Sequence, residues 1–127
     1  MCVKVFLADD SEIMRRAIRN LLSEREDIKL VGEAETFTET IQKATELQPD
    51  EIIFDLYMAE RANGHLPTLP TGPKVLAISL ANDDEAKALA ERIGAAKLLD
   101  KMELTNELIP AILELAPVGS RTFWITG

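Results

Sequence analysis

Short apolar runs alternate along this chain with longer segments of helical periodicity, and this alternation limits the fold more than any other feature. Each run has the length of a buried strand, and each longer segment repeats apolar residues three and four positions apart. A strand, a helix and a second strand in that order form a right-handed crossover between parallel strands. The expected strands span 3–8, 28–34, 50–55, 74–79 and 96–101, and the expected helices span 11–26, 36–47, 82–94 and 103–116. The sequence therefore predicts an α/β domain with a single doubly wound parallel sheet of five strands and helices on both faces.

The connection between the third and fourth strands breaks this pattern. Residues 59–74 contain three prolines and two glycines, which oppose a regular helix over most of that length (Pro67, Pro70, Pro73, Gly64 and Gly72). Residues 59–66 are long enough for about two helical turns, at ~3.6 residues per turn. An extended segment can also return to the next strand, because each residue spans roughly 3.3 Å. We therefore expect the third crossover helix to be abridged or absent.

Local signals mark the ends of two helices. Thr36 followed by Glu39 has the spacing of a capping box, in which each side chain bonds to a backbone N–H of the first turn. Asn82 is placed to cap the helix over 82–94, and Gly94 is placed to end it.

Composition excludes several classes of protein. Charges interrupt every apolar segment, so the sequence predicts neither a membrane-spanning helix nor a secretory signal. A single cysteine, Cys2, rules out an internal disulfide, and with one histidine, His65, no zinc cluster can form. The net charge of -8 opposes direct binding to nucleic acid, because phosphate contacts require a basic face. The expected setting is the reducing cytoplasm.

Polar residues stand at the ends of four expected strands: Asp9 with Asp10, then Asp55, Ser79 and Lys101. Asp9 and Asp10 alone have a simple interpretation, because aspartate accepts hydrogen bonds from the free N–H groups of a following helix. The carboxyl ends of parallel strands, however, meet at one edge of the sheet, where open α/β folds place their sites. If the first and third strands are neighbours, the three aspartates share one pocket.

Three carboxylates in one pocket need a compensating charge. At ~5 Å separation and an effective dielectric constant near 20, each pair repels by about 3 kcal/mol. Such a cluster protonates, takes up a lysine or binds a metal ion. Ligands that are all oxygen favour a hard cation, Mg²⁺ or Mn²⁺. The sequence therefore predicts a cation site formed by Asp9, Asp10 and Asp55.

The motifs LADDSE, IIFDLYM, VLAIS and LLDK occur in this order at four strand ends, and in them the chain resembles the receiver domain of two-component response regulators. The resemblance covers about residues 3–115, and the first half is most similar to receivers of LuxR-type (NarL/FixJ-like) regulators. It implies a flavodoxin-like sheet of order 2-1-3-4-5. It also implies a receiver domain over 1–116 and a C-terminal tail or linker over 117–127.

The resemblance further implies a role for each strand-end residue. Asp55 would accept a phosphoryl group from a sensor histidine kinase, and Ser79 and Lys101 would contact the phosphoryl oxygens. Mg²⁺ would be held by four groups: the side chains of Asp9, Asp10 and Asp55 and the backbone carbonyl of Tyr57. Such a domain is a signalling module and not an enzyme, although weak self-phosphorylation and dephosphorylation belong to the same chemistry.

Some positions depart from the family's pattern. Leu98 stands three positions before Lys101, where the family has an aromatic switch residue, and Ala59 and Met102 replace prolines. These differences leave open an alternative, a receiver-like interaction module that is not phosphorylated. A Mg²⁺-dependent phosphatase would need a D-x-D motif after the first strand, which ADDSE lacks. A flavin-binding protein is disfavoured because acids occupy the turn that would bind its phosphate.

For a phosphorylated receiver, the resemblance implies that the signal passes through altered protein–protein contacts. The expected partners are the sensor histidine kinase and a second copy of the chain, bound through the fourth helix, the fifth strand and the last helix. A DNA-binding output domain is expected if the chain is part of a longer regulator. No direct contact with nucleic acid or with a membrane is expected.

Overall fold

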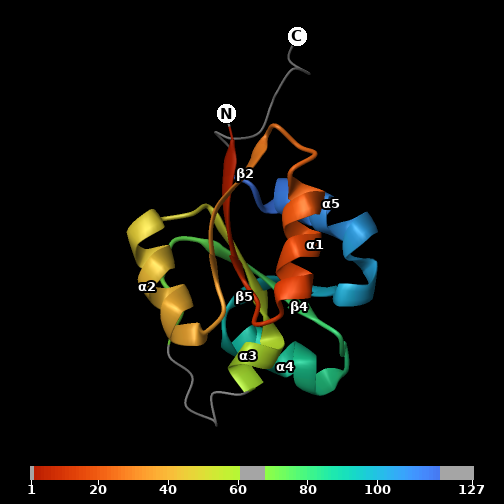
Figure 1. The fold of residues 1–127 in the computed structure, drawn as a ribbon. Coiled ribbons are helices and arrows are strands. Elements are labelled where there is room, and N and C mark those ends of the chain that lie inside the picture. Colours follow the sequence, from red (N-terminus) through yellow and green to blue (C-terminus); the bar gives the residue numbers. More distant parts are fainter. Residues whose placement is uncertain (1, 61–67, 118–127) are drawn as a thin grey trace.

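The computed structural model of the chain describes residues 2–60 and 68–117. These residues form a parallel sheet of five strands in the order β2-β1-β3-β4-β5, with helices between the strands (Figure 1). The strands are β1 (Val3–Ala8), β2 (Ile28–Ala34), β3 (Glu51–Asp55), β4 (Lys74–Ser79) and β5 (Ala95–Asp100). The helices are α1 (Glu12–Leu22), α2 (Phe37–Leu47), α3 (Leu56–Glu60), α4 (Asp84–Arg92) and α5 (Leu104–Leu115), and a short 3-10 helix, η1 (Lys101–Glu103), joins β5 to α5. The predicted fold class and strand order are confirmed.

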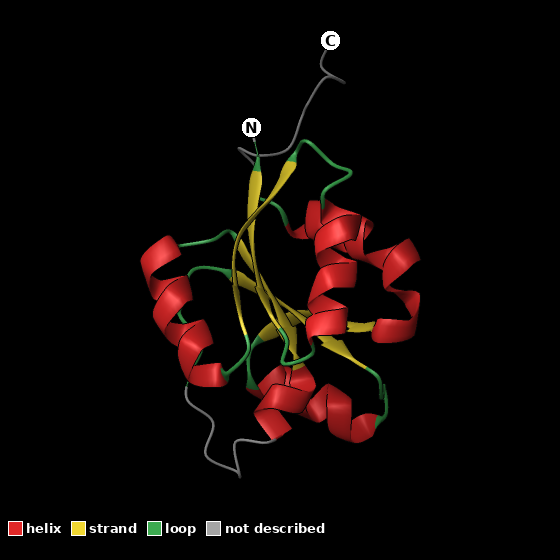
Figure 2. Ribbon diagram, viewed as in Figure 1, coloured by secondary structure: helices red, strands yellow, loops and turns green. Residues whose placement is uncertain are grey.

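Helices cover both faces of the sheet, with α1 and α5 on one face and α2 on the other (Figures 1 and 2). Val5 and Leu7 belong to the core shared with α1 and α5, whereas Phe6 and Ala8 belong to the core under α2, as the two-residue period of a strand requires. All five residues of β3, the central strand, are buried. Within the described residues, no helix has the length and apolar character that crossing a membrane requires.

Side chains cap the first two helices. The Ser11 hydroxyl accepts a hydrogen bond from the N–H of Met14 over 3.2 Å at the start of α1. At α2 the Thr36 hydroxyl accepts from the N–H of Glu39 over 3.1 Å, which confirms the first half of the predicted capping box. The Glu39 carboxylate turns back to the N–H of Glu35 over 2.8 Å, one residue further than the box expects. The turn before α2 is therefore held from both sides.

The predicted cap of α4, Asn82, is wrong by one residue. Asp83 caps the helix, and its Oδ1 accepts a hydrogen bond from the N–H of Ala86 over 2.9 Å. This start puts two further acids in the first turn, where the partial positive charge of the helix N-terminus stabilises them. The predicted end is confirmed, because Gly94 follows the helix with a φ of 78°, in the left-handed region that favours glycine.

The third crossover begins earlier than the sequence suggests. α3 follows Asp55 without a gap, so this helix is not absent, and its described part has five residues. Most of the predicted helical stretch, 59–66, lies outside the described residues. The described end of the crossover, 68–73, contains neither helix nor strand. In its described parts the crossover is therefore a helix that begins at Leu56 and an irregular return to β4, and its length beyond Glu60 lies outside the described residues.

Candidate functional site

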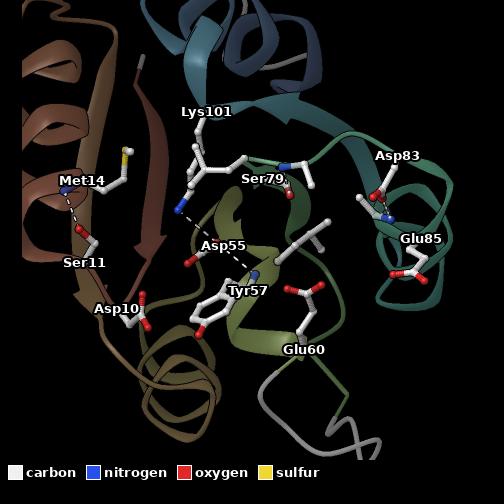
Figure 3. Close-up of a pocket in the computed structure, with 14 residues that line it drawn as sticks. Asp10, Ser11, Met14, Asp55, Tyr57, Glu60, Ser79, Asp83, Glu85 and Lys101 are labelled. Carbon is white, nitrogen blue, oxygen red and sulfur yellow. Dashed lines mark hydrogen bonds and ion pairs between the residues drawn. The ribbon is translucent and has the colours of Figure 1, made fainter.

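The carboxyl ends of β1, β3, β4 and β5 meet at one edge of the sheet and border a pocket of about 490 Å³ (Figure 3). Asp10, Asp55, Ser79 and Lys101 all line this pocket, each at the end of a different strand or within two residues after it. Tyr57, in the first turn of α3, lines it as well. The polar residues that the sequence places at these strand ends therefore lie together at one edge of the sheet.

Asp9, Asp10 and Asp55 form one acidic cluster, as predicted. Each contributes a carboxylate oxygen, and these three oxygens all lie within 4.8 Å of one another. Asp9 is 0% exposed and Asp55 is 2% exposed, whereas Asp10 faces the pocket. Donors that are all oxygen, and this close together, suit a hard divalent cation. The chemistry of the cluster therefore fits Mg²⁺.

Lys101 supplies a charge that such a cluster needs. Its Nζ lies 3.0 Å from Asp9 Oδ2 and 3.2 Å from Asp55 Oδ1, and its side chain is 8% exposed. Burial alone would lower the pKa of Lys101, but the hydrogen bond to Asp9 and the charges of Asp55 and Asp9 raise it above its usual value. Lys101 is therefore a buried ammonium group that offsets part of the repulsion between the acids.

Asp55 combines burial with several polar contacts. Burial raises the pKa of Asp55 to about 6, and the charge of Asp9 acts in the same direction. Lys101 and the N–H of Tyr57, which donates to Asp55 Oδ1 over 3.1 Å, act in the opposite direction. At neutral pH the ionised form of Asp55 therefore prevails, and a carboxylate oxygen is available as a nucleophile.

Of the two interpretations of Asp9, helix cap or cluster member, the structure bears out the second. Asp9 Oδ1 accepts a hydrogen bond from the N–H of Ser11 over 2.9 Å, while Oδ2 faces Lys101. The cap of α1 itself is Ser11. One oxygen of Asp9 thus orders the turn between β1 and α1, and the other belongs to the acidic cluster.

Ser79 and Tyr57 lie at the rim of the pocket. The Ser79 hydroxyl accepts a hydrogen bond from the N–H of Ala81 over 3.1 Å, within its own loop. Tyr57 is 54% exposed, and Figure 3 shows its ring beside Asp10 at the pocket mouth. The structure therefore places both residues at the pocket that the acidic cluster borders.

Sequence reasoning missed one residue of this region, Arg15. It is 6% exposed, and its Nη1 donates a hydrogen bond to the backbone carbonyl of Asp9 over 2.7 Å. The buried residues of α1 are Arg15, Ile18 and Leu22, at the spacing of a single helix face. An arginine at a position of the apolar face was therefore the available signal that it has buried partners.

A family match completes the description of this site. The family model of the response regulator receiver domain matches residues 5–113. The chain belongs to the response regulator receiver family. Receiver domains are signalling domains that bind Mg²⁺ at an acidic pocket, and the acidic cluster of this receiver lies at the carboxyl edge of its sheet.

Two curated relatives resemble this receiver over most of its length. It is 29% identical over 115 residues to the response regulator GacA of Pseudomonas syringae pv. syringae. The matched region covers 87% of this chain and 53% of GacA. It is also 29% identical over 126 residues to a protein-glutamate methylesterase/protein-glutamine glutaminase of Methanococcoides burtonii. That matched region covers 89% of this chain and 36% of the relative. The receiver thus spans about a third to a half of the length of these relatives.

A solved structure shows the same fold. The signal receiver domain of NarL from Mycobacterium tuberculosis matches this receiver with a TM-score of 0.74 at 26% identity, over 89% of this chain and 94% of that domain. The predicted resemblance to receivers of the LuxR-type, NarL-like regulators is confirmed.

Proposed function

We propose that this receiver accepts a phosphoryl group on Asp55 from a sensor histidine kinase in a Mg²⁺-dependent reaction. The observation that carries the proposal is the setting of Asp55, a buried carboxylate 3.2 Å from Lys101 Nζ and in one cluster with two further acids. Each acid added to the cluster increases the electrostatic repulsion between its carboxylates. A bound cation would offset this repulsion. A cation-assisted reaction at Asp55 gives this arrangement a purpose.

Four groups would hold the Mg²⁺ ion: the carboxylates of Asp9, Asp10 and Asp55 and the backbone carbonyl of Tyr57. When bound, the ion withdraws charge from the phosphoryl oxygens and so eases nucleophilic attack on phosphorus. Lys101 already contacts Asp9 and Asp55 and can neutralise a further phosphoryl oxygen from the same position.

The reaction itself is a displacement at phosphorus. A carboxylate oxygen of Asp55 attacks the phosphorus of a phosphohistidine, and the O–P bond of an acyl phosphate forms as the N–P bond breaks. The electron pair of the broken bond stays on the imidazole, which then takes up a proton from solvent. The Ser79 hydroxyl accepts from Ala81 and keeps its own proton, so it can donate to a phosphoryl oxygen.

The phosphoryl group would signal by altering protein–protein contacts. Its charge and oxygens attract Ser79 and Lys101, which end or follow β4 and β5, so the face of α4, β5 and α5 responds. We propose this face for contact with a second copy of the chain. In a longer regulator the receiver, over 1–116, would pass the change through the tail or linker over 117–127 to a DNA-binding output domain, all in the cytoplasm.

Incubation with Mg²⁺ and acetyl phosphate, followed by intact-mass measurement, tests the proposal. The receiver should gain one phosphoryl adduct that disappears when Mg²⁺ is chelated, and Asp55→Asn should gain none. Glu60→Gln is the matched control, because Glu60 lines the same pocket but is not a member of the acidic cluster. An adduct that survives in Asp55→Asn, or that is lost in Glu60→Gln as well, would contradict the assignment of Asp55.

Leu98 favours a second candidate, the receiver-like interaction module that is not phosphorylated. It packs against the cluster formed by Leu56, Ala77, Ala86 and Ala90, next to α4. An aliphatic side chain cannot reproduce the two ring positions of an aromatic switch. A folded receiver that gains no adduct from acetyl phosphate, at any Mg²⁺ concentration, would favour this module over the phosphoacceptor.

A further inference from the structure

Arg15 is a buried arginine that connects the acidic cluster to α1 and β2. Its side chain is 7% exposed, and Nη1 donates to the carbonyl oxygen of Asp9 over 2.7 Å. Nη2 donates to Glu12 over 2.9 Å and to Glu35 over 3.3 Å, and Nε lies 3.3 Å from a carboxylate oxygen of Glu33. The guanidinium is thus fixed by three carboxylates and directs one remaining edge at a single backbone carbonyl.

That carbonyl belongs to the peptide plane that joins Asp9 to Asp10. Because a peptide unit is planar, holding its oxygen also fixes the direction in which the chain enters Asp10. The N–H of Asp9 donates to the carbonyl of Ala34 at the end of β2 over 3.1 Å, so Arg15 holds the other side of the same residue. The bond from Arg15 therefore constrains the backbone that carries the Asp10 carboxylate.

We propose that Arg15 is a positioning residue for the reaction at Asp55. It holds the Asp9–Asp10 peptide so that the Asp10 carboxylate stands ready for a divalent cation before the ion arrives. The inference rests on the proposed function, since the cation and the phosphoryl transfer are part of it. Groups that orient metal ligands typically change metal affinity by about 10- to 100-fold when they are removed.

Arg19 provides a matched control in the same helix. It contacts two of the same carboxylates, Glu12 over 3.2 Å and Glu33 over 2.8 Å. Its side chain is 42% exposed, and none of its described contacts is with Asp9. A change at Arg19 therefore disturbs the same ion-pair network without touching the peptide that leads to Asp10.

The experiment compares the receiver with Arg15→Lys, Arg15→Gln and Arg19→Lys. A lysine keeps the charge but has one nitrogen, so it cannot bond to the Asp9 carbonyl and to the carboxylates of Glu33 and Glu35 together. Calorimetric titration gives the Mg²⁺ affinity, and the NMR amide signals of Asp10 and Ser11 in metal-free protein report the geometry of the turn. Thermal unfolding shows which variants are folded at the temperature of each measurement.

Both Arg15 variants should bind Mg²⁺ roughly 10-fold more weakly or worse, and their Asp10 and Ser11 amide signals should move before any metal is added. Phosphorylation by acetyl phosphate should then need more Mg²⁺ for half-maximal rate, while the rate at saturating Mg²⁺ changes less. Arg19→Lys should stay within about twofold of the unmodified receiver, because its ion pairs are exposed.

Native amide positions and Mg²⁺ affinity in Arg15→Lys and Arg15→Gln would overturn the inference, as would equal changes in Arg19→Lys. Loss of thermal stability alone, with unchanged affinity and amide signals, would reduce Arg15 to a structural ion pair and also overturn it. If the unmodified receiver binds no Mg²⁺ and takes up no phosphoryl group, the proposed function fails. In that case the metal-free amide signals still decide whether Arg15 holds the turn.

Discussion

The central strand β3 carries a buried acid at each end, and the two ends differ in what surrounds that acid. At the carboxyl end, Asp55 contacts Lys101 and the N–H of Tyr57. At the amino end, Glu51 is 0% exposed, and neither of its carboxyl oxygens has a hydrogen-bond partner among the described residues. Burial raises the pKa of both, to about 6 for Asp55 and to about 8 for Glu51, where the charge of Asp50 adds to the effect.

A buried acid does not by itself mark a functional site in this protein. Glu51 is protonated at neutral pH, so it is a buried neutral polar group. No hydrogen bond among the described residues replaces the hydration that its carboxyl group loses on burial. Asp55 is ionised at the same pH because a buried ammonium group and a backbone N–H stabilise its charge. The partners of the acid, and not its depth, therefore distinguish the carboxyl end of β3 from its amino end.

Removal of the lysine at the carboxyl end of β3 should have the largest effect. Lys101→Met leaves Asp9 and Asp55 buried without their ammonium partner, and breaking such a pair destabilises a protein by about 4 kcal/mol. Urea unfolding at pH 7.5 in metal-free buffer measures the loss. Added Mg²⁺ should restore more stability to Lys101→Met than to the unmodified receiver, because the ion replaces part of the missing charge.

Lys97→Met is the control for this change, since Lys97 lies in β5 and pairs with Glu114 at the surface over 2.7 Å. Its removal should alter stability by less than about 1 kcal/mol. Equal urea midpoints for Lys101→Met and the unmodified receiver would show that the acidic cluster does not depend on Lys101.

Replacement of the acid at the amino end of β3 should act in the opposite direction. Keeping Glu51 protonated at pH 7, well above its usual pKa of 4.5, costs about 3 kcal/mol of folding free energy. Glu51→Leu removes this cost, and urea unfolding at pH 7 should show a gain of that order. Glu46→Leu, at an exposed position of α2, should change stability by no more than about 0.5 kcal/mol. A loss of stability in Glu51→Leu would mean that the Glu51 carboxyl makes a favourable contact.

The pH dependence of stability should carry the signature of Glu51. Its pKa is higher in the folded protein than in the unfolded chain, so unfolding releases a proton between about pH 4.5 and 8, and stability falls as the pH rises through this window. Relative to Glu51→Leu, the free energy of unfolding of the unmodified receiver should fall by about 1.4 kcal/mol for each unit of rising pH near neutrality. Urea unfolding of both proteins at several pH values gives this difference, from which the other titrating groups cancel. Parallel stability curves would contradict the raised pKa.

Much of the fold was predictable because the strands are short, mostly apolar runs, each with a polar residue at or just after its carboxyl end. The structure places β1 at Val3–Ala8 and β4 at Lys74–Ser79, the limits that the runs predicted. The strand order came only from the resemblance to receivers, because crossovers of similar length are compatible with many orders of parallel strands. The cap of α4 was missed by one residue because Asn82 and Asp83 are adjacent and both suit the role.

The candidate site was predictable for residues at strand ends and not for residues whose burial depends on distant partners. Asp55 and Lys101 follow from their places in the chain once the strands are known. Arg15 is buried because Glu33 and Glu35 approach it from β2 and the segment after it, about twenty residues away. Its place on the apolar face of α1 indicates that it has buried partners but does not identify them. Glu51 is buried because β1 and β4 flank the first residue of β3, which depends on the strand order.

The smallest effect is expected from the lysine nearest Glu51, which sharpens the contrast between the two ends. Lys74 lies opposite Glu51 in the register of β3 and β4, but its side chain is exposed. Its charge lowers the pKa of Glu51 by less than burial raises it. Lys74→Met should therefore change stability at pH 7 by less than about 0.5 kcal/mol, because Glu51 is neutral there and offers no charge to lose. Above pH 8, where Glu51 ionises, the same change should cost more, and urea unfolding at pH 7 and pH 9 measures both. A loss at pH 7 as large as that of Lys101→Met would mean that Glu51 is an ionised partner of Lys74, and the two ends of β3 would then be alike.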